Sequence, residues 1–167
     1  MTATVSGLFP VMNQPYDILS VEPEFVDGGV AVVDGLGNID DVGDFLHIGV
    51  DNPFGTGQVA AGQSDQEWSG AGPTLRTETG SVTCVVICRD ADGDQRACRT
   101  RCEGILATVQ RLLRTNIRLD PEGFTAPYGL VKTSFGGLEY DQDNAEDGAL
   151  ALAVFRVGFT FNLNSEG

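Results

Sequence analysis

The segment 94–115 carries the pattern that most constrains the fold, because its apolar residues recur on one side of a helix. They are separated by four and three residues in turn, at Cys98, Cys102, Ile105, Val109 and Leu112. This spacing predicts an amphipathic helix roughly 33 Å long, with Asp92 or Asp94 as its N-cap. A helix of this kind needs an apolar surface to pack against.

Two long segments near the C-terminus predict the strands of a β-hairpin. They are 128–140 and 149–163, and residues 141–148 between them are expected to form the loop. In the second segment, one face is apolar through Ala153, Phe155, Val157, Phe159, Phe161 and Leu163. Arg156, Gly158, Thr160 and Asn162 alternate with them, so the second half of this strand is expected to be buried on one side only.

Three further apolar segments predict the remaining strands. Residues 30–33 and 45–50 are short, whereas residues 79–89 are apolar on both faces and are expected inside a sheet. We therefore predict a single domain, residues 1–167, of the α+β class. It should contain one mainly antiparallel or mixed sheet of four to five strands, one long covering helix and a long C-terminal β-hairpin.

Two segments have no clear periodic pattern. In residues 1–24, Gly7, Pro10 and Pro15 work against a long helix, and the structure of this segment stays open. Residues 52–77 are rich in glycine, glutamine and serine and predict a long loop. Phe54 and Trp68 make this loop a candidate docking loop for a partner, and a flexible surface loop is the alternative.

All four cysteines form two pairs with a spacing of four residues: Cys84 with Cys88, and Cys98 with Cys102. Four thiolates can bind zinc, so these residues are weak candidates for a metal site. Two cysteines four residues apart on a strand are roughly 13 Å apart, however, which is too far to share one ion. We favour the alternative that they are small apolar residues of the core, and we expect no cofactor.

The turn between the two cysteine pairs is rich in aspartate. Asp90, Asp92 and Asp94 match the first three ligand positions of an EF-hand calcium loop. Gln95 stands where that loop requires glycine, and Arg101 stands where it requires a bidentate glutamate. Capping of the following helix explains these aspartates better.

Residues typical of catalysis are scarce in this sequence. His47 is the one histidine, and it lies in an apolar predicted strand. One histidine rules out a two-histidine metal site, and no sequence motif supports a nucleophile–histidine pair around it. Phosphate-binding glycine loops and hydrolase motifs are also missing. We therefore expect a protein that is not an enzyme.

Charge is distributed unevenly along the chain. The net charge is −14, yet the segment 89–118 contains seven arginines and only four acidic residues. An acidic body would repel nucleic acid, so we predict that this basic surface meets an acidic surface of a second copy. The candidate interface residues are Arg96, Arg99, Arg101, Arg111 and Arg114. A solvated helix face is the alternative.

The order of these parts resembles a known family. The sequence contains VVDG, then FLHIGVDNP, then a glycine-rich loop that leads into RTETGSVTCVVICRDADGDQRACRTRC, and finally the hairpin. This order, from about Val30 to Leu163, is similar to the tail terminator (tail completion) proteins of long-tailed bacteriophages, particularly those of actinobacterial hosts. Arg76, Glu78, Arg96 and Arg99 match as structural positions, and the resemblance implies no catalytic or metal-binding residue.

The resemblance implies a homohexameric ring in the virion, assembled in the host cytoplasm. Such a ring caps the head-proximal end of the tail tube, stops its polymerisation and joins the head-to-tail connector, while DNA passes through the bore. In this setting the acidic residues of the hairpin loop are candidates for the lining of the bore, where they would repel phosphate groups: Asp141, Asp143, Glu146 and Asp147. A solvated outer turn is the alternative.

Two other functions stay open at this point. The first is a head-side neck or connector protein of the same phage machinery. The second is a cytosolic zinc-binding module built on the four cysteines. We expect no contact with a membrane, because the longest apolar run has seven residues, well below the roughly 20 of a membrane span.

Overall fold

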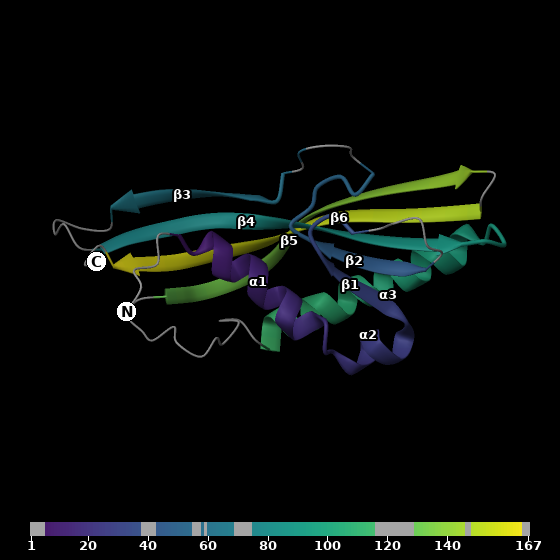
Figure 1. Cartoon of the computed structure of the whole chain (residues 1–167), viewed down its shortest axis with the longest axis horizontal. Coiled ribbons are helices and arrows are strands. Elements are labelled where there is room, and N and C mark those ends of the chain that lie inside the picture. Colours follow the sequence, from purple (N-terminus) through teal and green to yellow (C-terminus); the bar gives the residue numbers. More distant parts are fainter. Residues whose placement is uncertain are drawn as a thin grey trace.

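The computed structural model of the chain describes residues 6–37, 43–54, 58, 60–68, 75–115, 129–145 and 148–164. Three helices and six strands occur in these segments (Figure 1). In chain order they are α1 (Leu8–Leu19), α2 (Pro23–Gly28), β1 (Val30–Asp34), β2 (Asp44–Ile48), β3 (Gly62–Trp68), β4 (Leu75–Asp90), α3 (Gln95–Thr115), β5 (Gly129–Ala145) and β6 (Gly148–Asn164). The predicted α+β class, the long helix and the C-terminal hairpin are confirmed.

The strands form one mixed sheet around β4. Its order is β1-β2-β4-β6-β5, and β3 also pairs with β4. The β1–β2 pair is parallel and the other pairs are antiparallel. Strands β2 and β3 share one edge of β4, because β2 pairs with residues 84–88 and β3 with residues 76–82. Strand β4 thus has neighbours on both edges, and the apolar residues 79–89 lie inside the sheet, as the sequence predicts.

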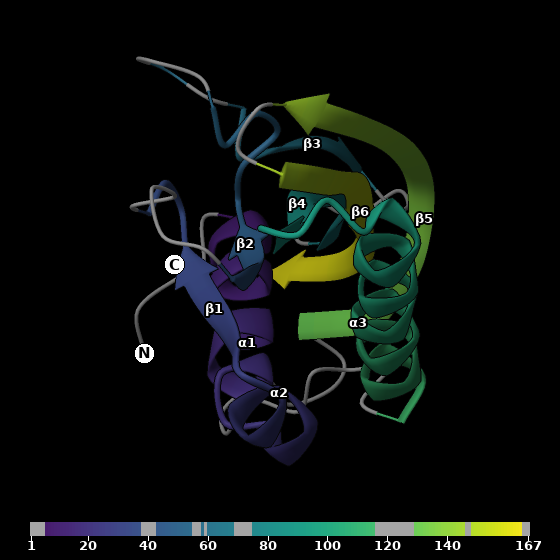
Figure 2. The ribbon, with the colours of Figure 1, turned by 90° about the vertical axis from the view of Figure 1, so that its right-hand side faces the viewer.

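One face of the sheet is covered by α1 and α3 (Figure 2). The apolar stripe of α3 packs against this face, and the main core lies between them. Phe155 and Phe161 of β6 are its largest fully buried side chains. The alternation predicted for β6 is confirmed, because the predicted apolar face from Ala153 to Leu163 lies in this core.

The N-terminal segment, left open by the sequence, contains helix α1. Glu78 of β4 is fully buried, and its carboxylate accepts hydrogen bonds from the Gly7 N–H at 2.7 Å and from the Ser6 hydroxyl. The carboxylate therefore binds the positive end of the helix. A Cβ on Gly7 would lie 2.4 Å from the Phe161 ring, so only glycine permits this close approach.

The prediction of an unbroken loop over residues 52–77 is wrong. Strand β3 occupies residues 62–68, and β4 already begins at Leu75. Among the described strands β3 pairs only with β4, and its residues are mostly polar and exposed, so it lacks the apolar alternation that predicts a strand. Strand β3 also raises the strand number to six, above the predicted four to five.

The hairpin is longer than predicted. Strand β5 continues to Ala145 and β6 starts at Gly148, so residues 141–145, expected in a loop, belong to a strand. The sequence after Tyr140 is polar because this end of β5 is exposed. Gly148 has a φ of 113°, and a Cβ there would lie 2.1 Å from the Asp90 carbonyl oxygen, so the turn requires glycine.

The opposite face of the sheet carries a second and smaller apolar cluster. Phe45, Val85 and Ile87 are buried there against partly buried side chains of β1 and β6. His47 also lies in the interior, and its Nδ1–H donates to the Gly35 carbonyl oxygen at 3.1 Å. His47 thus lies in a strand, as the sequence predicts, and it is fully buried there.

Candidate interaction surfaces

The aspartate-rich turn before α3 works as a helix cap. The Asp94 carboxylate accepts a hydrogen bond from the Ala97 N–H at 3.0 Å, and Asp90 accepts from the N–H groups of Asp92 and Asp94. These contacts, with the nearby Arg101, lower the pKa of the Asp90 carboxyl. The capping prediction is confirmed for Asp94.

The cysteines lie in the main core, with less than 2% of each side chain exposed. Burial raises the pKa of the Cys84 thiol to about 12, and a hydrogen bond with Cys102 raises the pKa of Cys88. The Cys98 thiol donates to the Ala149 carbonyl oxygen at 3.6 Å. Within the described part of the chain, no three His, Cys, Asp or Glu side chains are grouped to hold a metal ion. The arrangement favours the core interpretation of these residues.

Two of the five candidate interface arginines form ion pairs with described carboxylates of the same chain. The Arg101 guanidinium lies 2.9 Å from the Asp44 carboxylate and 3.5 Å from that of Asp90. Arg111 contacts Glu22 and Glu24 at the start of α2, at 3.2 and 2.9 Å. These ion pairs join α3 to β2, β4 and α2, so they contribute to the fold.

The other three candidate arginines lie on the exposed side of α3. Arg99 donates to the Gln142 side-chain oxygen of β5 at 3.0 Å, and Arg96 lies one turn earlier. Arg114 lies near the other end of α3, in the wall of a hollow of about 260 Å³ against Thr133 and Phe135 of β5. The junction between α3 and β5 is therefore bordered by exposed cations at both ends.

Two of the four acidic candidates of the hairpin lie among the described residues. Asp141 and Asp143 are exposed on β5, opposite Leu152 and Leu150 of β6. Directly paired residues share a side of the sheet, so both carboxylates lie on the face without helices. Glu146 and Asp147 lie outside the described residues. Figure 1 shows that this end of the hairpin is far from β3 along the long axis.

Both aromatic residues of the predicted docking loop are exposed. Trp68 is 61% exposed at the end of β3, and the Arg76 guanidinium lies 5.1 Å from its ring centroid. Phe54 is 43% exposed and lies 5.8 Å from the Arg89 guanidinium. Exposed aromatic rings are costly in water and common in protein interfaces. The docking role stays a prediction.

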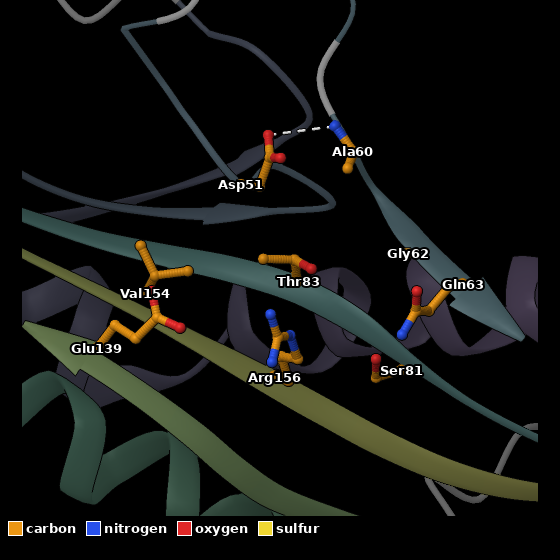
Figure 3. A pocket seen from close by; sticks show the side chains of 9 residues that line it. All are labelled: Asp51, Ala60, Gly62, Gln63, Ser81, Thr83, Glu139, Val154 and Arg156. Carbon is orange, nitrogen blue, oxygen red and sulfur yellow. Dashed lines mark hydrogen bonds between the residues drawn. The ribbon is translucent and has the colours of Figure 1, made fainter.

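A groove on the face without helices was not visible in the sequence. It has a volume of about 350 Å³, and Figure 3 shows the side chains around it. They come from five separate segments: Asp51, Ala60, Gly62, Gln63, Ser81, Thr83, Glu139, Val154 and Arg156. No described residue forms an ion pair with Arg156, so its guanidinium can receive a hydrogen-bond acceptor. The groove suits a polar segment of a partner.

The chain matches no protein-family model, and no curated protein is significantly similar to it. None of the helices in the described segments has the length and apolar character needed to span a membrane. The function must therefore be inferred from the fold and from the chemistry of the surfaces.

Proposed function

We propose that this protein is a structural virion protein that forms a ring at the head-proximal end of a phage tail tube. The observation that carries the proposal is the separation of charge on a small α+β domain. Helix α3 contains five arginines and one acidic residue, whereas the chain as a whole has a net charge of −14. The fold is also the one that the resemblance to tail terminator proteins implies.

Separated charge favours association between identical copies. A basic surface and an acidic surface on one subunit can join head to tail, and such heterologous contacts form a closed ring when the rotation permits. Opposite charges on the two surfaces also suppress wrong orientations. A homo-oligomeric ring, six copies by the resemblance, is therefore part of the proposal.

The acidic end of the hairpin fits a bore through which DNA passes. Asp141 and Asp143 are exposed and lie in a row on one face of β5. Carboxylates at the wall of a bore repel phosphate groups, so DNA can slide without binding. Two further partners complete the proposal: the tail tube protein, with Phe54 and Trp68 as docking residues, and the head-to-tail connector.

A phage that lacks this protein tests the proposal directly. We expect tail tubes that grow beyond their normal length and filled heads that carry no tail, with both defects repaired by the protein supplied in trans. Tails of normal length joined to filled heads would contradict the proposal.

Binding assays then distinguish the head-side alternative. The purified protein should bind isolated tail tubes and not filled heads that lack tails. The reverse result would assign the protein to the head-side neck.

A further inference from the structure

We propose that one copy joins the next edge to edge, with the α3–β5 flank of one copy against the α2–β1 flank of its neighbour. This inference rests on the proposed ring and names the two surfaces that build it. The occupant of each flank is thus a second copy of this chain.

The α2–β1 flank is acidic and partly apolar. Residues 6–34 contain five acidic residues and no lysine or arginine. Glu22 and Glu24 are paired with Arg111, whereas Asp17, Asp27 and Asp34 are exposed. Val21 and Val26 of the same segment are 70% and 62% exposed. The exposed side chains of this segment are thus carboxylates and valines.

The α3–β5 flank has the complementary composition. Arg96, Arg99 and Arg114 are exposed along α3. Strand β5 adds Leu138, 54% exposed, and Tyr140, 39% exposed. Because Gln142 contacts Arg99, and alternate residues of a strand share a face, Tyr140 lies on the helix side of β5. This flank offers guanidinium groups around an apolar centre.

The two flanks include the two opposite edge strands of the sheet, β1 and β5, while α2 itself contacts α3 through Arg111. Strands β1 and β5 are the two ends of the strand order, and Figure 2 shows α3 on the β5 side and β1 on the other. Among the described residues, β1 pairs only with β2, and β5 only with β6. A contact between two different edges repeats from copy to copy, which suits a ring.

A second copy explains these flanks better than nucleic acid does. DNA would match the arginines but would leave the valines, leucine and tyrosine exposed, and it would be repelled by the acidic body. A neighbouring copy covers the apolar residues of both flanks and pairs both sets of charges. The Arg111 contacts with Glu22 and Glu24 already join α3 to α2 in this way within one copy.

Two charge-reversed variants test the inference. One carries changes on the basic flank, R96E, R99E and R114E, and the other carries changes on the acidic flank, D17K, D27K and D34K. All six residues are exposed, so we expect both variants to fold, which circular dichroism verifies. Light scattering should find each variant monomeric, because its two flanks then carry charges of the same sign.

An equimolar mixture of the two variants should recover the mass of the wild-type ring. In alternating copies every junction again joins opposite charges, arginine with aspartate and glutamate with lysine. As a control, D141K/D143K at the hairpin end should keep the wild-type mass. A ring that persists in both variants would overturn this inference and leave the proposed function standing. A mixture that stays monomeric would do the same.

Two other results are equally informative. If the arginine variant keeps its ring and loses binding to duplex DNA, the basic flank is a nucleic-acid surface and the inference is wrong. If the wild-type protein is monomeric at every concentration, both this inference and the proposed function are wrong.

Discussion

The two faces of the sheet differ in what covers them. The helix-covered face packs against α1 and α3 and contains most of the buried apolar side chains, including Phe155 and Phe161. The other face has a small buried cluster of Phe45, Val85 and Ile87, and beside it the polar groove with Arg156. One face therefore contains the main core, while the other face combines a smaller buried cluster with a polar groove.

Neighbouring residues of β6 show this difference most clearly. Phe155 points to the helix-covered face, is 1% exposed and stacks on Phe135 at 5.1 Å between ring centroids. Arg156 points to the other face and borders the groove. A substitution of Phe155 should therefore mainly lower stability, whereas a substitution of Arg156 should mainly weaken binding at the groove.

Phe155→Ala should have the largest effect on stability. It removes a buried aromatic side chain and leaves a cavity, which costs about 3–5 kcal/mol in the free energy of unfolding. Urea denaturation measures the loss. Phe54→Ala, at a residue that is 43% exposed, is the matched control, and an equal loss in both variants would show that the core does not lie where we place it.

Glu78→Ala should have the next largest effect, about 2–4 kcal/mol, because it leaves the buried Gly7 N–H without its acceptor and also removes the partner of the Ser6 hydroxyl. Amide hydrogen exchange should show that α1 loses protection before the strands do. Glu78→Gln keeps an acceptor and should lose less. If the alanine and glutamine variants are equally stable, the carboxylate does not hold the helix.

Acid should weaken the interior around His47. Burial lowers the pKa of this histidine below its ordinary 6.5, so below that pH the unfolded chain binds a proton that the folded chain does not. Stability should therefore fall as the pH drops from about 6.5, by at most about 1.4 kcal/mol per pH unit. His47→Gln should flatten this part of the stability profile, and an unchanged slope would exclude His47 as its source.

Arg156→Ala should have the smallest effect on folding, within about 0.5 kcal/mol of the wild type. If the groove receives a polar segment of a partner, this variant should bind that partner more weakly while its melting curve is unchanged. A loss of stability as large as that of Phe155→Ala would mean that Arg156 supports the core.

The sequence predicts the parts of this structure in which a local period reflects burial. Helix α3 and strand β6 have clear periods of about 3.6 and 2.0 residues, and both are found where expected. Helix α1 contains Pro15, and its N-terminus is held by Glu78, a residue more than 70 positions away. A contact between residues so far apart in the sequence leaves no local pattern from which the helix could be predicted.

The candidate surfaces show the same limit. Exposed arginines are visible in the sequence, but it does not distinguish Arg101, paired with Asp44, from Arg96, which is exposed on α3. The groove around Arg156 was missed because five segments must come together to form it. Strand β3 was missed because its exposed polar residues lack an apolar period.

Association of identical copies is the central claim, and the mass of the purified protein tests it most directly. Light scattering combined with negative-stain imaging should show rings with a central opening and a mass that is a multiple of 17.7 kDa, six-fold by the resemblance. A single 17.7 kDa particle at every concentration, together with virions that lack this protein at the collar, would contradict the account.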